Sequence, residues 1–201
     1  MTTARDLTFV SSDVASEYPV ERGDLALALA GAELIDLLAA GTVVLDDGLV
    51  RPAEGAGSGD PLLAAAAGTV RGEPRESVAD WLWRRGEGLA DTYRAATGTE
   101  DRGRPRRAVW RTAERTAPAA PADPRDRGGA ADRWHAGEPV LVALAAAVGI
   151  RHDEADRIAD PDDEAVTTVL AAVGDAVVEL AAIRQRRSVE EAAFDNIWRG
   201  W

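Results

Sequence analysis

The chain has 201 residues, 46% of them hydrophobic and 29% charged, which is typical of a globular protein of about one domain. Its net charge of −12 argues against general affinity for nucleic acid. The absence of cysteine excludes disulfides, thiolate metal sites and cysteine catalysis.

The N-terminal part predicts a lead-in, a helix and a hairpin. Residues 1–20 show no clear period, and their apolar side chains fit a short strand or a packed lead-in. Leucines at helical spacing predict a helix over residues 24–40, with Gly41 as a left-handed C-cap. Residues 42–51 predict a small hairpin, because the Asp-Asp-Gly sequence at 46–48 supplies the positive φ of a tight turn.

A short helix is predicted after a glycine-rich loop. The loop covers residues 52–59, and Asp60 and Pro61 then provide an N-cap and a first helical residue for a helix that ends near Val70.

The next predicted helix begins near Ser77 and ends at Gly98. Gly86 and Gly88 fall inside it and predict a kink or break, since each costs roughly 1 kcal/mol in a helix interior. The following segment is rich in Pro, Ala, Asp and Gly, and residues 116–134 are predicted to form a mobile loop.

The C-terminal third predicts helices throughout. Residues 139–148 are apolar nearly all round, as in a buried helix that Gly149 ends. Asp160 begins a long helix, and the capping box at 188–191 predicts a separate last helix. The predicted fold class is therefore all-α, a helical bundle with one or two small β-hairpins, in a single domain over residues 1–201.

No targeting or membrane-spanning segment is expected. The first ten residues lack the apolar stretch of a signal peptide, and residues 139–150 are too short to span a bilayer. Asp175 and Glu179 interrupt the other apolar segment. We therefore expect a cytoplasmic protein.

Metal and catalytic sites find little support in the sequence. The spacing of His135 and His152 matches no helical ligand pair, so surface or capping roles are expected. The acidic run at 160–164 lacks the pattern of a calcium loop and fits helix capping. We predict no metal, no cofactor and no catalytic residues.

One region of this acidic chain is locally basic. From Arg84 to Arg115 there are nine arginines and five acids, with Trp110 among them and Trp81 and Trp83 just before them. Arginine binds phosphate bidentately and tryptophan favours the headgroup boundary of a bilayer, so this pattern is compatible with a membrane-facing surface. A solvated arginine face with Trp81 in the core is the simpler alternative.

The order of helix, hairpin and Gly-Asp-Pro-Leu-Leu resembles the Golgi phosphoprotein 3 family in its shorter bacterial form. The anchors are residues 29–41, 59–63, 80–82 and 141–149. The resemblance implies an all-α membrane adaptor that binds phosphatidylinositol 4-phosphate without catalysis.

The family's lipid site transfers only in part. Its tryptophan falls near Glu21, with Tyr18 the nearest aromatic, and its helical arginine falls at Ala30. The resemblance implies that Arg84 and Arg85 correspond to its later arginine pair, with Arg22 as a candidate substitute for the helical arginine. The family's protruding hairpin, used for oligomer contacts and membrane dipping, corresponds to Arg104, Arg106, Arg107, Trp110 and Arg111.

Two functions follow as expectations. The first is a peripheral adaptor that recognises an anionic lipid headgroup, on the inner face of the membrane, through Tyr18, Arg22, Arg84 and Arg85. The second is a protein-interaction module that has the same fold and has lost lipid binding, as Glu21, Ala30 and the negative charge favour. A protein partner and a homo-oligomer are compatible with both, and nucleic acid is not an expected partner.

Overall fold

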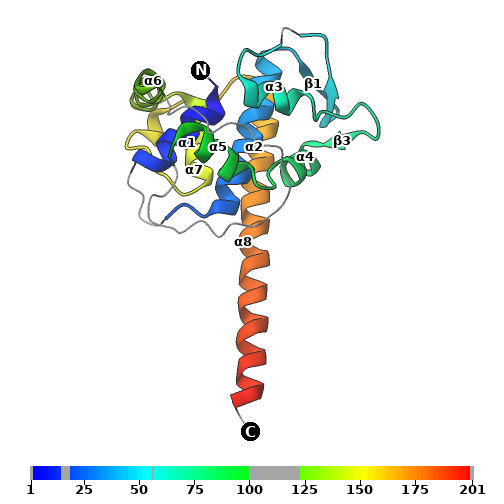
Figure 1. Cartoon of the computed structure of the whole chain (residues 1–201), viewed down its shortest axis with the longest axis vertical. Helices are drawn as coiled ribbons and strands as arrows, with labels where there is room; N and C mark the ends of the chain where they lie inside the picture. Colours follow the sequence, from blue (N-terminus) through cyan, green and yellow to red (C-terminus); the bar gives the residue numbers. More distant parts are fainter. Residues whose placement is uncertain (1, 15–18, 56, 100–122, 200–201) are drawn as a thin grey trace.

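The computed structural model describes residues 2–14, 19–55, 57–99 and 123–199, the last eight of these by their backbone alone. The described elements are α1 (Thr3–Asp13), α2 (Arg22–Ala39), β1 (Val43–Asp46), β2 (Leu49–Pro52), α3 (Pro61–Ala67), β3 (Glu76–Ser77), α4 (Val78–Arg85), α5 (Leu89–Thr97), α6 (Pro124–His135), α7 (Pro139–Ala147), the 3-10 helix η1 (Ala155–Arg157) and α8 (Glu164–Arg199). The predicted all-α class is confirmed (Figure 1).

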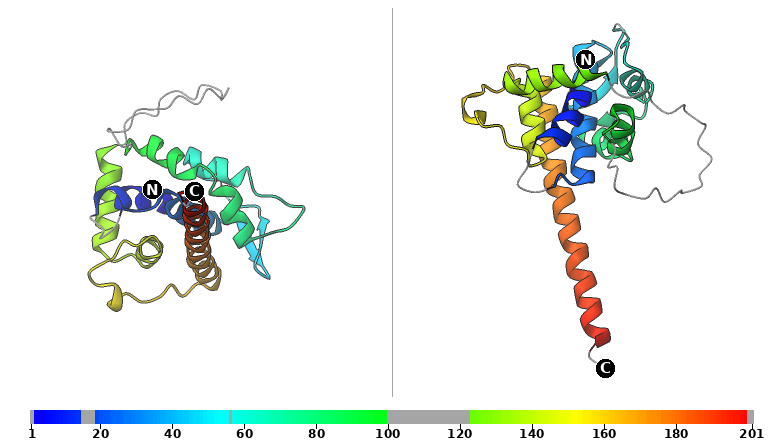
Figure 2. Two further views of the ribbon diagram at one scale, coloured as in Figure 1. Left: turned by 90° about the horizontal axis from the view of Figure 1, so that it is seen from below. Right: turned by 60° about the vertical axis from the view of Figure 1, so that its left-hand side comes forward.

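Helix α2 is the centre of the body. Twelve of its eighteen residues are buried, because leucine and alanine occupy nearly every side of the helix. Helices α1, α4, α5, α7 and α8 all pack against it. The two views of Figure 2 show α2 enclosed in this way, and Figure 1 places the small sheet at one edge of the body and α6 at the other.

Helix α8 packs closely against α2. A Cβ added to Gly31 of α2 would lie 2.4 Å from Cγ2 of Val173 in α8. Val169 and Val173 are fully buried on this face of α8. The absence of a side chain at Gly31 therefore lets the two longest helices pack closely.

The predicted hairpin is confirmed, and a third strand joins it. Strands β1 and β2 are antiparallel with Asp46 opposite Leu49, and Asp47 and Gly48 have φ values of 52° and 74°. Strand β3 pairs with β2 through Val50 and Glu76. The sequence did not predict β3, because two residues are too few to show an alternating pattern.

The predicted starts of α3 and α4, the break between α4 and α5 and the end of α5 at Gly98 are also confirmed, whereas α3 ends at Ala67 and not near Val70. The carboxylate of Asp60 accepts hydrogen bonds from the amides of Leu62 and Leu63 at 2.9 and 3.1 Å, with Pro61 at the first turn. The glycine pair separates α4 from α5, and Gly88 has a φ of 71°. A positive φ favours glycine, because glycine has no Cβ.

Two predictions for irregular segments are wrong. The first residues form helix α1, with Leu7 fully buried and Thr2 as N-cap, instead of a strand. Residues 124–134, expected to belong to a mobile loop, lie in α6, which begins with Asp123 as N-cap and Pro124. Residues 116–122 of that predicted loop lie outside the described residues.

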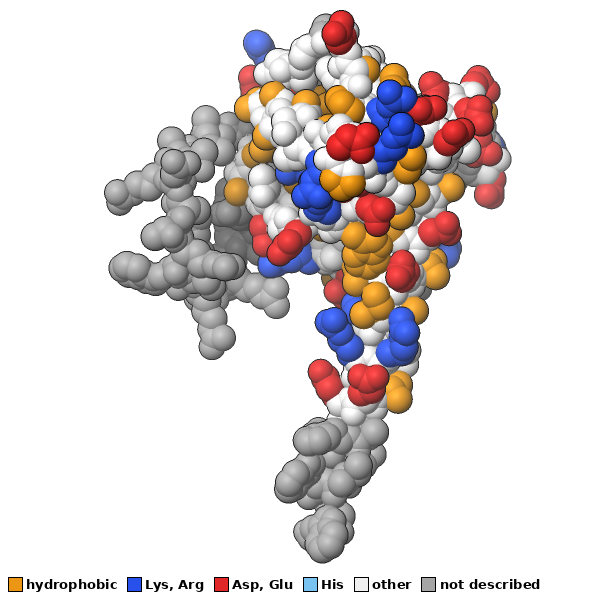
Figure 3. Space-filling view, turned by 90° about the vertical axis from the view of Figure 1, so that its right-hand side faces the viewer, with side chains coloured by type: hydrophobic (Ala, Val, Ile, Leu, Met, Phe, Trp, Pro, Cys, Tyr) orange, Lys and Arg blue, Asp and Glu red, His pale blue; other side chains and the backbone are white. Residues whose placement is uncertain are grey.

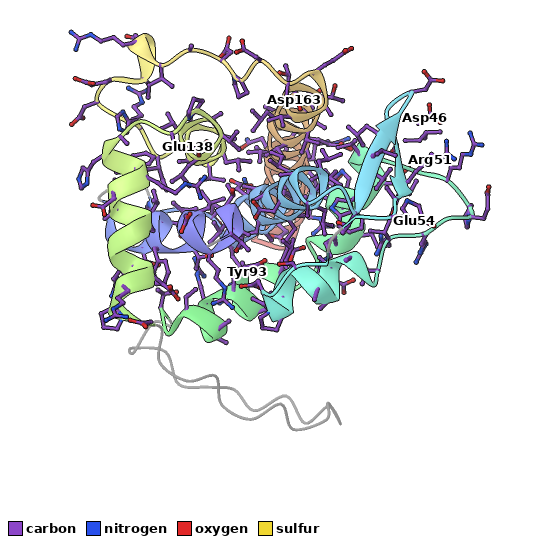
Figure 4. All side chains as sticks on the ribbon, turned by 90° about the horizontal axis from the view of Figure 1, so that it is seen from above. Asp46, Arg51, Glu54, Tyr93, Glu138 and Asp163 are labelled. Atoms are coloured by element: carbon purple, nitrogen blue, oxygen red, sulfur yellow. The ribbon has the colours of Figure 1, made fainter. Side chains whose placement is uncertain are left out.

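The prediction of two C-terminal helices is also wrong. Helix α8 is continuous from Glu164 to Arg199, so the sequence at 188–191 does not begin a new helix. Its N-cap is Asp163, whose carboxylate accepts from the amides of Ala165 and Val166 at 2.8 and 3.0 Å. Figure 4 shows Asp163 at the start of α8 and Glu138, which caps α7 in the same manner, at the start of that helix.

Helix α8 projects far out of the body (Figure 1). Its segment Glu164–Glu191 is, by length and composition, apolar enough to cross a membrane: its most apolar 18-residue window has a mean hydropathy of 1.9, and 17% of that window is buried. Asp175 and Glu179 therefore do not rule out a membrane-spanning helix in this segment, contrary to expectation. The packing of its first half against α2, α4 and α7 is equally typical of a core helix.

Candidate functional site

Arg85 is held inside the body by a buried carboxylate. Its Nε and Nη2 donate to the two oxygens of Glu33 at 2.7 and 2.9 Å, and Glu33 is fully buried in α2. The hydroxyl of the buried Tyr93 donates to Glu33 Oε1 at 3.0 Å. Tyr93 is labelled on α5 in Figure 4. These three hydrogen bonds, two from Arg85 and one from Tyr93, satisfy both carboxylate oxygens of Glu33.

Burial shifts the titration of this cluster. Desolvation raises the pKa of Glu33, and the hydrogen bond and charge of Arg85 oppose that rise. Desolvation likewise raises the pKa of Tyr93, with a further rise from the charge of Glu33. Both shifts reflect how strongly the interior disfavours negative charge, so Arg85 serves to compensate Glu33.

Arg84 is occupied by a different carboxylate. Its Nε and Nη2 donate to Glu76 of β3 at 2.6 and 2.7 Å, and Nη2 also lies 3.3 Å from the carbonyl oxygen of Thr69. The guanidinium lies over the ring of Trp81 at 5.1 Å. Hydrogen bonding to Glu76 raises the pKa of Arg84. Arg84 thus ties α4 to the sheet.

Arg22 lies elsewhere, at the start of α2. Its Nη1 is 3.2 Å from the carboxylate of Asp91 in α5, and the two side chains are 60% and 55% exposed. Arg22, Arg84 and Arg85 therefore each pair with the carboxylate of a different element. The remaining predicted site residues, Tyr18, Arg104, Arg106, Arg107, Trp110 and Arg111, lie outside the described residues.

A groove of about 410 Å³ opens where α8 leaves the body, and we call it the α2–α8 groove. Its lining comes from α2 (Arg22, Gly23, Ala26, Leu27), from the α4–α5 region (Trp83, Gly86, Glu87, Gly88, Ala90, Asp91) and from Leu180 of α8. Figure 3 shows hydrophobic side chains gathered on this face near the base of α8, among separate acidic and basic groups.

Two glycines that line this groove are tightly packed. A Cβ on Gly23 would lie 2.7 Å from Cδ2 of Leu180, and one on Gly86 would lie 2.8 Å from the carbonyl oxygen of Leu82. Trp83 remains 37% exposed beside them. An apolar floor with an exposed tryptophan and two rim carboxylates, Glu87 and Asp91, is suited to binding a partner segment more than to phosphate.

A second hollow, of about 740 Å³, is polar and lies between α1, α2 and the start of α3. Asp36 lines it together with the ion pair of Arg5 and Asp60. Desolvation raises the pKa of Asp36 to about 6, against hydrogen bonds from residues 3 and 4. With three carboxylates (Asp36, Asp60 and Asp126) and one paired arginine among its described lining residues, this hollow is unsuited to an anion.

The expected capping role of His152 is confirmed. Its Nδ1 accepts from the amide of Glu154 at 3.2 Å, so Nε2 carries the proton and donates to the carbonyl oxygen of Trp134 at 2.9 Å. Over the residues whose side chains are described, 2–14, 19–55, 57–99 and 123–191, no group of three His, Cys, Asp or Glu residues is placed to hold a metal ion.

Sequence reasoning missed the carboxylates that neutralise the arginines. Glu33 is the only acid between Asp24 and Asp36 in a helix of leucine and alanine, and this isolation was a usable signal for a buried, paired charge. Glu76 gave no such signal, because it lies in β3 and Arg84 in the helix that follows directly, and the sequence does not reveal the angle between that strand and that helix.

Comparison with known proteins agrees with the fold. A search of curated proteins and a search of solved structures each returned no match. The sequence profile of Golgi phosphoprotein 3 (GPP34) matches residues 4–192, which is nearly the whole chain. The chain therefore belongs to the Golgi phosphoprotein 3 family.

Proposed function

We propose that this protein is a non-enzymatic adaptor that acts as a protein-interaction module, with the α2–α8 groove as its binding surface. Family membership supports an adaptor role, since the family is of that type. The occupant we propose is a segment of a partner protein that has apolar side chains toward the groove and basic side chains at its rim.

The main support for this proposal is that Arg84 and Arg85 are already paired with carboxylates of the protein. Arg84 and Arg85 each give two donors to a largely or fully buried carboxylate, in Glu76 and Glu33. Binding a phosphate through the Nε and Nη2 donors would require these ion pairs to break, which would leave a buried carboxylate without compensation at a cost of about 3–5 kcal/mol. A headgroup site built on this pair is therefore unfavourable.

The charge of the groove favours a basic partner. Glu87 and Asp91 lie on its rim, and the single arginine there, Arg22, is paired with Asp91. The chain as a whole carries a net charge of −12, which steers cations toward it and anions away. A basic amphipathic segment would pack its apolar side chains on the floor of the groove and pair its basic side chains with the acidic rim.

Site-specific photo-crosslinking tests the proposal. A photoreactive residue replaces Trp83 in the groove, and a matched one replaces Val44, which is 45% exposed on the hairpin. We expect a discrete protein adduct from position 83 in the producing cells and none from position 44. Glu87→Arg should reduce that adduct several-fold, whereas Glu73→Arg, an equal charge change on an exposed loop, should not. Lipid adducts at position 83, or no adduct, would overturn the proposal.

Recognition of an anionic headgroup is the second candidate, and one observation favours it. Arg22 is 60% exposed and lies on the same groove as Trp83, so a guanidinium and a tryptophan face solvent together. If the groove binds such a headgroup at the inner face of a membrane, Arg22→Ala should abolish binding, and Arg84→Ala should leave it unchanged in a folded variant.

A further inference from the structure

We infer that the projecting part of α8 pairs with the same helix of a second copy, in antiparallel orientation. The inference is independent of the α2–α8 groove. It starts from a face of α8 that the body leaves uncovered along its described length.

The uncovered face follows a heptad spacing. Val178, Ala182, Gln185 and Val189 are separated by four, three and four residues, and all four are exposed. Val178 and Val189 are 70% and 57% exposed, among the most exposed large hydrophobic residues described. Residues at this spacing form one stripe of a helix and are the seam through which helices pair.

The same stripe continues toward the body without being covered. Thr168, Ala171 and Asp175 extend it at the same spacing, and each is exposed. The buried face of α8, which contains Val169 and Val173, points elsewhere, toward α2. A second helix can therefore lie along α8 on this stripe without displacing a described contact of the body.

The projecting half also lacks support of its own. Residues 185–191 are all exposed, and the helix continues from there to Arg199. A helix without tertiary contacts is only marginally stable in water at such lengths, because most helical stability in proteins comes from packing. A regular helix that extends this far from the body thus fits a partner along its length.

Charge selects a second copy, in antiparallel orientation, as that partner. Glu179 and Arg186 flank the stripe on the same side, seven residues apart. When Val178 of one copy lies opposite Val189 of the other, Glu179 of each copy comes near Arg186 of the other. The two-fold symmetry forms this pair twice. Parallel pairing would instead place Glu179 beside Gly174 and Arg186 beside Ala181 of the other copy, so neither charge would meet an opposite one.

The other flank of the stripe permits a close approach. Ala181 and Ser188 occupy it, and both are small and exposed. Figure 3 shows the basic side chains of the projecting part of α8 followed by acidic ones toward its end. The chain therefore presents a self-complementary surface, which is the requirement for an isologous contact.

Engineered cysteines test the register directly, because the chain has no cysteine of its own. The double variant Val178→Cys/Val189→Cys should form disulfide-linked dimers under mild oxidation of the full chain. Val189→Cys alone should not, since antiparallel pairing separates the two copies of this residue by 11 positions, about 16 Å. Efficient dimers from Val189→Cys alone would indicate parallel pairing and overturn the inference.

A charge exchange tests the same pairing without cysteine. The native chain should sediment at twice its mass of 21.2 kDa at micromolar concentration. Glu179→Arg and Arg186→Glu should each weaken the dimer about tenfold or more, and the double variant should restore it. Glu73→Arg, on an exposed loop, is the matched control and should have no effect.

Three results would contradict the inference. One is a native chain that stays monomeric at all accessible concentrations. Another is a dimer that the single charge reversals leave unchanged while circular dichroism shows them folded. The third is a monomer that associates with vesicles of neutral lipid, which would mean that the stripe on α8 contacts a bilayer instead.

Discussion

Glu33 shows how a single residue can determine what its neighbours are free to bind. Its carboxylate is fully buried in the central helix and takes two donors from Arg85 and one from Tyr93. An arginine that appears in the sequence as part of a basic cluster is thereby committed to the interior. The same holds for Arg84 and Glu76 at the edge of the sheet.

Removing Arg85 should destabilise the protein strongly. We expect Arg85→Ala to lower the free energy of unfolding by about 3–5 kcal/mol, because Glu33 would remain buried without its cation. Arg51→Ala is the matched control, since Arg51 pairs with Asp46 at the surface and should contribute under about 1 kcal/mol. Urea unfolding measures both, and equal small losses would show that the Glu33 pair is not a structural requirement.

Asp36 should make stability depend on pH. Its pKa rises from 3.8 to about 6 on folding, so between these values the folded protein retains a proton that the unfolded chain has released. Stability should therefore fall as pH rises through this interval, by roughly 3 kcal/mol from Asp36. Burial raises the pKa of Asp6 and Glu33 as well, which adds dependence of the same sign.

The share of Asp36 can be isolated by substitution. Asp36→Asn keeps an oxygen that can accept from the amide of Ala4 and removes the titration, so the fall in stability across the interval should shrink by roughly 3 kcal/mol. Asp162→Asn, at an exposed position, should leave the profile unchanged. Urea titrations at several pH values provide the measurement, and identical profiles for Asp36→Asn and the native chain would refute the assignment.

At the scale of elements, the contact between α2 and α8 depends on Gly31. Alanine normally stabilises a helix interior relative to glycine by up to about 1 kcal/mol. At Gly31 the added Cβ would instead meet Val173 at 2.4 Å, so Gly31→Ala should cost about 1–3 kcal/mol. Thermal or urea unfolding would reveal this reversal of sign.

Two further variants make the Gly31 test specific. Gly174→Ala, in α8 with nothing within 4 Å of the new Cβ, should be neutral or stabilising. Val173→Ala should be destabilising alone yet reduce the cost of Gly31→Ala in the double variant, because the two positions share one space. Additive effects would mean that the helices do not meet closely at this point.

Elements with a strong local signal could be predicted from the sequence, and elements defined by tertiary contacts could not. The Asp-Gly turn, the Asp60 cap and the break at Gly86 and Gly88 are local and were all predicted. Helix α1 was not, since its buried face includes Thr3, Asp6 and Thr8, which obscure the apolar period. The continuity of α8 was missed because a capping sequence alone cannot show whether a helix is interrupted.

The candidate site was predicted less well than the fold for a related reason. The sequence identifies the arginines, but their chemistry depends on carboxylates 52 and 8 residues away, in Glu33 and Glu76. Trp83 was noticed in the sequence, whereas the groove beside it requires Gly23 and Leu180 to come together from opposite ends of the chain. Such juxtapositions arise from tertiary packing only.

At the scale of the whole molecule, an acidic helical body presents an apolar groove at the base of a long projecting helix. The chain has the fold of the Golgi phosphoprotein 3 family. Arg84 and Arg85, which the resemblance relates to lipid binding, are neutralised by Glu76 and Glu33. These features favour protein partners over anionic surfaces, because the net charge opposes an approach to negative lipids.

Vesicle flotation of the full chain tests this account most directly. Vesicles of neutral lipid are compared with vesicles that also contain phosphatidylinositol 4-phosphate, at low and at physiological salt. We predict that the phosphorylated headgroup causes no increase in the floated fraction at either salt concentration. Salt-sensitive flotation that requires the headgroup and disappears in a folded Arg22→Ala variant would contradict the account.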